Sequence, residues 1–157
     1  MKKLALILSI FASLPALADS ERTAVPLTPQ YQSECGSCHV AFPPGLLSKA
    51  DWRKTMARLD RHFGTDASVD ARTHQSILSY LERNAGSRSA AQAAAEPRIT
   101  ATNWFKKEHR EVPGSAWKDS RVKTAANCVA CHGGAEQGRY GESEIAVPGM
   151  QRGHKED

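Results

Sequence analysis

Apolar side chains recur at helical spacing early in the chain. The pattern predicts a helix from about Ala50 to Phe63, with Ser48 as its N-terminal cap and Gly64 as its stop. One face of this helix carries Trp52, Met56, Leu59 and Phe63. Because these positions follow at i, i+4, i+7 and i+11, we expect them to form a buried stripe.

A second helix is predicted from about Val69 to Asn84, ending at Gly86. Its buried face carries Ile77, Leu78 and Leu81. The segment before the first helix, residues 19–34, is expected to be extended because it contains two prolines.

The second half of the chain predicts short helices between loops. Asn103 is expected to cap a helix to about Val112, stopped by Pro113, and another helix is expected from about Ser120 to the second cysteine pair. The glycine-rich tail should be irregular, and no run alternates convincingly over strand length. The predicted fold class is therefore all-α with extensive loops.

The first eighteen residues predict a signal peptide. Lys2 and Lys3 precede an apolar run, and Ala16-Leu17-Ala18 is a small-residue cleavage signal. The run is shorter than the roughly 20 residues that a membrane-spanning helix needs. We expect cleavage after Ala18 and export to the periplasm.

Export changes the charge and size of the protein. Without Lys2 and Lys3, Lys+Arg falls from 21 to 19 against 17 Asp+Glu, so the net charge of +4 becomes +2. This balance gives no support for nucleic-acid binding.

The small, polar, Ala-rich stretch at 87–98 is the predicted linker between domains at 19–86 and 99–157. Domains this small usually need a disulfide, a metal or a cofactor to complete the core.

Two Cys-x-x-Cys-His motifs, at residues 35–39 and 128–132, are the strongest chemical signal. Disulfides suit an exported protein but give no role to the histidines. A four-sulfur zinc site usually has its cysteine pairs about 15 to 20 residues apart, whereas 89 residues separate Cys38 from Cys128. Covalent haem c uses all six residues, with two thioether bonds and a proximal histidine ligand per motif. We therefore predict two haems, one on each motif. The six binding residues are Cys35, Cys38, His39, Cys128, Cys131 and His132.

A second axial ligand for each iron must come from elsewhere in the chain. The candidates are His62, His74, His109, His154, Met56 and Met150. His109 shares a predicted helix face with Phe105, and His62 lies at the edge of the first apolar stripe. His74 also faces an apolar side, so the residues alone leave it as a rival. A core role is the usual one for Met56, and a solvated role for His154.

Five segments of the chain together resemble a known family. They are YQSECGSCHVAFPPGLL, WRKTMARLDRHFG, ILSYLERNAG, RITATNWFKKEHREVP and VKTAANCVACHGGAEQGRYGESEIAVPG. The chain resembles the small periplasmic dihaem cytochromes c of the DHC type. The resemblance implies two covalent-haem domains, the N-terminal one like a reduced class I cytochrome c, and bis-histidine ligation of both haems.

The resemblance also implies the distal ligands and the partners. His62 and His109 lie in matching motifs and take the distal places, so the predicted iron ligands are His39, His62, His109 and His132. We pair His62 with the first haem and His109 with the second, and a crossed pairing stays open.

Family partners are a soluble oxygen-binding monohaem cytochrome c and membrane b-type cytochromes. We expect an electron carrier of low potential and not an enzyme. The alternative is a peroxidase-like or gas-binding protein with one open axial site.

Overall fold

The computed structural model describes residues 25–87 and 96–150. The predicted leader, most of the predicted linker and His154 lie outside the described residues. The α-helices are α1 (Pro29–Cys35), α2 (Lys49–Met56), α3 (Ala71–Arg83), α4 (Asn103–Glu108) and α5 (Gly114–Trp117). Short 3-10 turns are η2 (Pro44–Leu46), η3 (Leu59–Arg61), η4 (Ile99–Ala101), η5 (Cys128–Ala130), η6 (Ala135–Gln137) and η7 (Glu142–Glu144).

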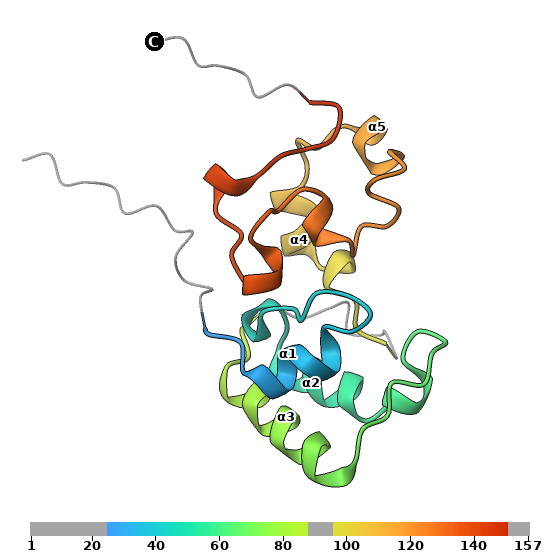
Figure 1. Ribbon diagram of the computed structural model, residues 1–157, viewed down its shortest axis with the longest axis vertical. Coiled ribbons are helices and arrows are strands. Elements are labelled where there is room, and N and C mark those ends of the chain that lie inside the picture. Colours follow the sequence, from blue (N-terminus) through green and yellow to red (C-terminus); the bar gives the residue numbers. More distant parts are fainter. Residues whose placement is uncertain (1–24, 88–95, 151–157) are drawn as a thin grey trace, which may run out of the picture.

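The helices form two groups, one above the other (Figure 1). The lower group consists of α1, α2 and α3, and the upper group of α4, α5 and the turns that follow them. Pairing of β type within the described residues is limited to isolated bridges. The expected helical fold with long loops is therefore confirmed, whereas the domain boundaries stay a prediction. No helix formed by residues 25–87 and 96–150 has the length and apolar character needed to cross a bilayer.

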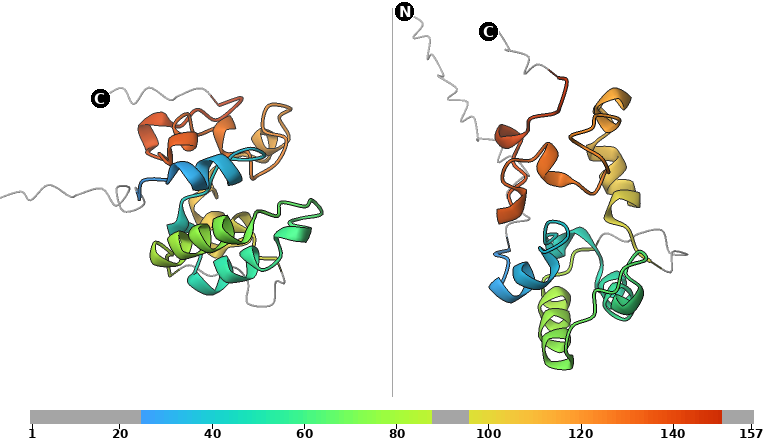
Figure 2. Two further views of the ribbon diagram at one scale, coloured as in Figure 1. Left: turned by 60° about the horizontal axis from the view of Figure 1, so that its bottom comes forward. Right: turned by 45° about the vertical axis from the view of Figure 1, so that its right-hand side comes forward.

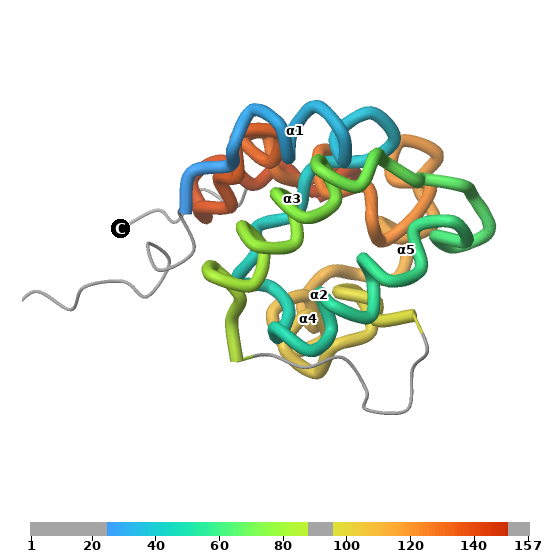
Figure 3. The backbone as a smooth tube through the Cα atoms, turned by 90° about the horizontal axis from the view of Figure 1, so that it is seen from below, coloured from blue at the N-terminus to red at the C-terminus, as the bar shows by residue number. Residues whose placement is uncertain are grey.

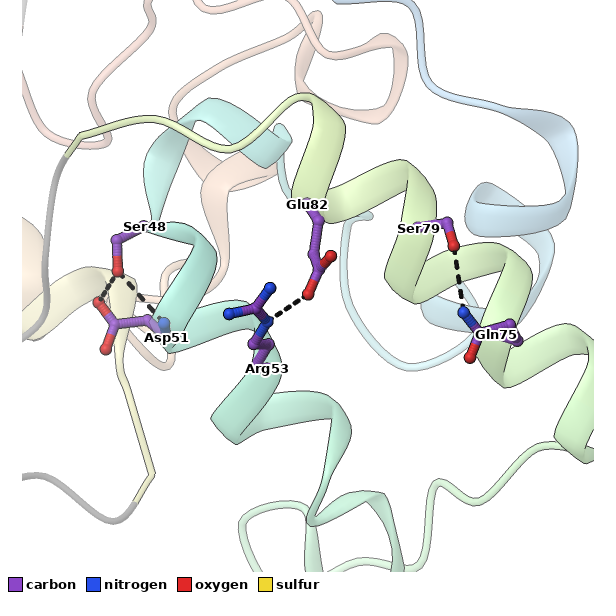
Figure 4. A network of polar contacts seen from close by, with 6 residues as sticks. All are labelled: Ser48, Asp51, Arg53, Gln75, Ser79 and Glu82. Carbon is purple, nitrogen blue, oxygen red and sulfur yellow. Dashed lines mark hydrogen bonds and ion pairs between the residues drawn. The ribbon is translucent and has the colours of Figure 1, made fainter.

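Side-chain caps decide where the principal helices begin. Ser48 Oγ accepts a hydrogen bond from the Asp51 backbone N–H (3.2 Å) and donates one to the Asp51 carboxylate (2.8 Å), as Figure 4 shows. The predicted cap of this helix is thus confirmed. The Asp70 carboxylate accepts bonds from the Arg72 and Thr73 N–H groups at the start of α3, and the Thr28 hydroxyl accepts one from the Tyr31 N–H at the start of α1. Each cap satisfies backbone N–H groups that the first turn of a helix leaves without partners.

The main core lies between α1, α2 and α3. An Arg53–Glu82 ion pair joins α2 to α3 at the surface (Figure 4). In the core, Trp52 donates its indole N–H to the Pro44 carbonyl at 2.7 Å. The buried apolar cluster comprises Tyr31, Ala41, Leu46, Leu47, Trp52, Met56, Ile77, Tyr80, Leu81 and Ile99. Ile99 comes from beyond the predicted linker, so the second half of the chain contributes to the core of the first.

The two helix groups also touch where α1 meets η6. Gln32 of α1 donates its amide to the Glu136 carbonyl at 3.3 Å. Figures 2 and 3 show α1 beside the C-terminal segment in views from other directions. This contact brings the end of α1 close to the second cysteine motif.

The first predicted helix ends earlier than its apolar pattern suggests. Helix α2 stops at Met56, and a 3-10 turn follows over Leu59–Arg61. Phe63, the last residue of the predicted stripe, has a left-handed φ of 48° and is exposed. The Leu59 carbonyl accepts a bond from the Ala67 N–H at 2.8 Å, so the chain folds back instead of continuing as a helix.

Three further expectations differ from the structure. Residues 29–35 are helical and not extended, because Thr28 caps a helix with proline in its first turn. The helix predicted after Ser120 does not form, because side chains of Asp119 and Asn127 bond to the local backbone instead. The helix predicted to reach Val112 ends at Glu108, and Thr102 is its cap.

Candidate functional site

The first cysteine motif follows directly from α1. This helix ends at Cys35, and Gly36 then turns the chain where an added Cβ would lie 2.3 Å from the Gln32 carbonyl oxygen. His39 donates Nδ1–H to the Val40 carbonyl at 2.7 Å, because a carbonyl can only accept. Its ring stacks on Phe42 with centroids 4.7 Å apart. The His39 Nε2 atom is therefore left with its lone pair, as a metal ligand requires.

His62 lies opposite His39. The two ring centroids are 6.1 Å apart with the rings inclined by 41°. Burial, followed by the nearby His39 ring, lowers the pKa of His62, which favours the neutral imidazole. The early end of α2 makes this placement possible, because a helix continued to Phe63 would carry His62 in a different direction.

The second motif has an equivalent pair. His109 caps the C-terminal end of α4, and its Nδ1–H donates to the Phe105 carbonyl at 2.9 Å. Its ring stacks on Phe105 at 4.0 Å and lies 5.9 Å from Trp117. The centroid of His132 is 6.1 Å from that of His109. Burial, followed by the nearby His109, lowers the pKa of His132.

Comparison with known proteins agrees with these motifs. A model of the family described as DHC, dihaem cytochrome c, matches residues 31–140. The chain belongs to the dihaem cytochrome c family. It therefore carries two covalently bound c-type haems.

Solved dihaem cytochrome structures resemble this one over most of their length. The dihaem cytochrome c from Rhodobacter sphaeroides is 37% identical, with a TM-score of 0.65 over 72% of this chain and 96% of that chain. The dihaem cytochrome c from Shewanella baltica OS155 is 35% identical, with a TM-score of 0.68 over 79% of this chain and 95% of that chain. Among curated proteins, none matches the chain.

The residues present fit haem c better than zinc or disulfides. Two imidazoles on opposite sides of one metal ion, each nitrogen about 2 Å from it, have centroids roughly 6 Å apart, as both pairs do. None of the four cysteines forms a disulfide with another. Within the described residues, no three His, Cys, Asp or Glu side chains gather as a metal cluster would require. Haem iron takes only two protein ligands, so paired histidines suffice.

Both cysteine motifs border one cleft of about 510 Å³. Cys38 and His39 line it from the first motif, and Cys128 and Val129 from the second. The two attachment sites of this dihaem cytochrome therefore open onto a common space, although 89 residues separate the motifs in sequence.

The other candidate axial ligands either bond to another part of the protein or lie away from both histidine pairs. His74 Nε2 bonds the Met56 carbonyl at 3.0 Å and so links α3 to the end of α2. Met56 is in the core and Met150 is 49% exposed. These positions agree with the sequence-based preference for His62 and His109, although the ligand assignment itself stays a prediction.

Sequence reasoning missed most of the aromatic residues around the four imidazoles. Phe42 stacks on His39, Trp117 lies beside His109, and Tyr140 lies beside His132. Phe105 had a usable signal, because it shares a predicted helix face with His109. Phe42 and Tyr140 come from loops and Trp117 from the four-residue helix α5, and no periodic pattern indicates their direction.

Proposed function

We propose that this dihaem cytochrome is a periplasmic electron carrier in which both irons have two histidine ligands. The first haem would be held by Cys35, Cys38, His39 and His62, and the second by Cys128, Cys131, His132 and His109. The observation that carries the proposal is the pair of facing imidazoles at each motif, with centroids 6.1 Å apart in both cases.

The protein side chains support a carrier because each iron would have both axial positions closed. Haem supplies the redox chemistry, a one-electron exchange between ferric and ferrous iron. Burial lowers the pKa of His62 and of His132, which favours the neutral imidazole that can donate a lone pair. An open axial site, which peroxide or gas chemistry needs, would require one of these histidines to move away.

The ligand set also predicts the redox range. Methionine as an axial ligand raises the potential of a c-type haem. Met56 is in the core and Met150 is exposed, and neither is paired with His39 or His132. We therefore expect both potentials to lie below those of ordinary His/Met cytochromes c.

The direction of electron flow rests on the export signal and on the family resemblance. The proposed donor is a quinol-linked membrane cytochrome of b type, and the proposed acceptor is a soluble oxygen-binding monohaem cytochrome c. The cleft shared by the two motifs supports passage of electrons between the haems inside one small protein. Docking should be weak and transient, as in other electron-transfer complexes.

The test is a potentiometric titration of periplasmic protein together with carbon monoxide binding. The proposal predicts two one-electron steps at low potential and a ferrous protein that reacts poorly with carbon monoxide. Rapid stoichiometric binding to one haem would contradict the carrier and favour the alternative with an open axial site.

A further inference from the structure

Three of the four paired imidazoles can be compared by what their Nδ1 atoms, which would point away from the iron, contact. His39 and His109 each donate Nδ1–H to a backbone carbonyl, at 2.7 and 2.9 Å. The Nδ1 atom of His132 is buried and has no hydrogen-bond partner. Histidines that ligate metals almost always donate this second N–H to an acceptor, which fixes the ring and strengthens its donation to the metal. His132 therefore still needs an acceptor for its Nδ1–H group.

Tyr140 packs beside the His132 ring. Its ring lies 5.2 Å from the His132 ring, centroid to centroid, with the planes inclined by 60°. The Tyr140 hydroxyl is also buried and has no nitrogen or oxygen partner among the described residues. Burial raises the pKa of Tyr140, and the nearby Cys128 side chain raises it further. Buried polar atoms in native proteins are nearly always paired, so two unpaired ones in adjoining rings call for an explanation.

Local backbone geometry directs Tyr140 toward the motif. Gly138 has a left-handed φ of 75°, which reverses the chain after η6. The Arg139 N–H then bonds the Gly134 carbonyl at 2.9 Å and closes the turn. A backbone bridge between His132 and Ile145 holds the other side of the loop. Tyr140 is thus placed by a defined turn.

We propose that Tyr140 is a positioning residue of the second haem site, with its hydroxyl oxygen accepting a hydrogen bond from His132 Nδ1–H, directly or through one buried water. The phenol oxygen has lone pairs that can accept this bond, and its own O–H group can still donate toward Cys128. A single water is a plausible bridge chemically, since buried waters typically join two to four polar groups. The inference rests on the proposed function, because it takes His132 as an iron ligand.

The proposed hydrogen bond makes the reduction potentials of the two haems respond differently to substitution. A hydrogen bond accepted from Nδ1–H makes the imidazole a stronger donor, which favours ferric iron and lowers the potential. At the first motif the acceptor is the Val40 backbone carbonyl, which no side-chain substitution removes. At the second motif the proposed acceptor is a side chain, so one substitution can change the potential of this haem.

The test is Tyr140→Phe, which keeps the ring against His132 and removes only the acceptor. Spectroelectrochemical titration of the haem-loaded protein should show the second haem easier to reduce. We expect its ratio of reduced to oxidised form at a fixed solution potential to rise roughly three- to tenfold, which is about 30 to 60 mV for a one-electron couple. The first haem should not change, and a parallel titration of His62→Ala identifies which potential belongs to it.

The matched control is Tyr80→Phe. Tyr80 donates its hydroxyl to the Pro26 carbonyl at 3.1 Å and packs on Tyr31 in the main core. This variant makes the same chemical change away from both histidine pairs, so both potentials should stay as in the wild type. An unchanged or lower second potential in Tyr140→Phe, or an equal shift of both haems, would overturn the proposal.

A second readout does not depend on potentials. In ferric protein, the His132 Nδ1 proton should give a hyperfine-shifted NMR signal, whose exchange with solvent should become faster in Tyr140→Phe. If exchange is unchanged while the wild type has two low-spin haems, the Tyr140 inference fails and the proposed function stands. If the wild type itself has a high-spin haem at the second motif, the proposed function fails first.

Discussion

Thr102 should control how firmly His109 is held. Thr102 is 2% exposed and lies at the start of α4, the six-residue helix that ends just before His109. Its Oγ1 accepts from the Phe105 N–H at 3.1 Å and donates to the Ile99 carbonyl at 2.7 Å. A helix of this length is not stable alone, so its cap is a large part of what keeps it formed.

Thr102→Val removes both bonds without changing side-chain volume. Loss of the cap costs about 1 kcal/mol. The Ile99 carbonyl keeps its bond from the Thr102 backbone N–H at 3.1 Å, so loss of the hydroxyl bond to it costs only about 0.5 to 1.5 kcal/mol more. The free energy of opening α4 should therefore fall by about 1.5 to 2.5 kcal/mol. If α4 opens as a local unit, the fraction of molecules with His109 detached rises roughly ten- to sixtyfold, at about 1.4 kcal/mol per tenfold.

The assay is the rate of carbon monoxide binding to ferrous protein, measured beside urea denaturation. Binding at one haem should accelerate in proportion to His109 detachment, while the other haem remains slow. The matched control is Ser48→Ala, which removes the cap of α2, a helix that carries none of the four paired histidines. It should lower stability without changing carbon monoxide binding. Equal binding rates in Thr102→Val and wild type would refute the view that this cap positions His109.

Two further substitutions test the structure around the sites. His74→Ala removes the bond to the Met56 carbonyl and should cost about 1 kcal/mol of unfolding free energy in denaturation experiments. The optical spectra of both haems should not change, and a new high-spin band would make His74 a ligand after all. Gly86→Ala would place a Cβ 2.1 Å from the Gly45 carbonyl oxygen, so urea denaturation should show a loss of about 1 to 3 kcal/mol. Gly45→Ala, whose Cβ would meet no atom within 4 Å, is the control and should behave almost as wild type.

The extent of helix α3 could be predicted from the sequence. It spans Ala71–Arg83 against a prediction of about 69 to 84, since its apolar spacing is regular over this segment. The cap of α2 was also identified, but not its end. That end depends on a bond from the Ala67 N–H to the Leu59 carbonyl, a contact across eight residues that no local pattern indicates.

Some residues of the candidate sites could be predicted from the sequence and others could not. The cysteine motifs have a fixed spacing and can be found by inspection. His62 was expected on a helix, yet it reaches His39 because it lies beyond the helix, after the turn at Leu59–Arg61. Tyr140 gave no signal, because its direction is set by the left-handed Gly138 in a loop. Irregular turns, which sequence periodicity does not indicate, place these two side chains.

The most direct test of the central claim is spin state, measured on periplasmic protein by optical and resonance Raman spectroscopy. The wild type, His62→Ala and His109→Ala should be compared in ferric and dithionite-reduced forms. The account predicts two low-spin haems per chain without a methionine–iron band in the wild type, and one high-spin haem in each variant. A five-coordinate high-spin iron in the wild type, or a variant that keeps both haems low-spin, would contradict bis-histidine ligation by these residues.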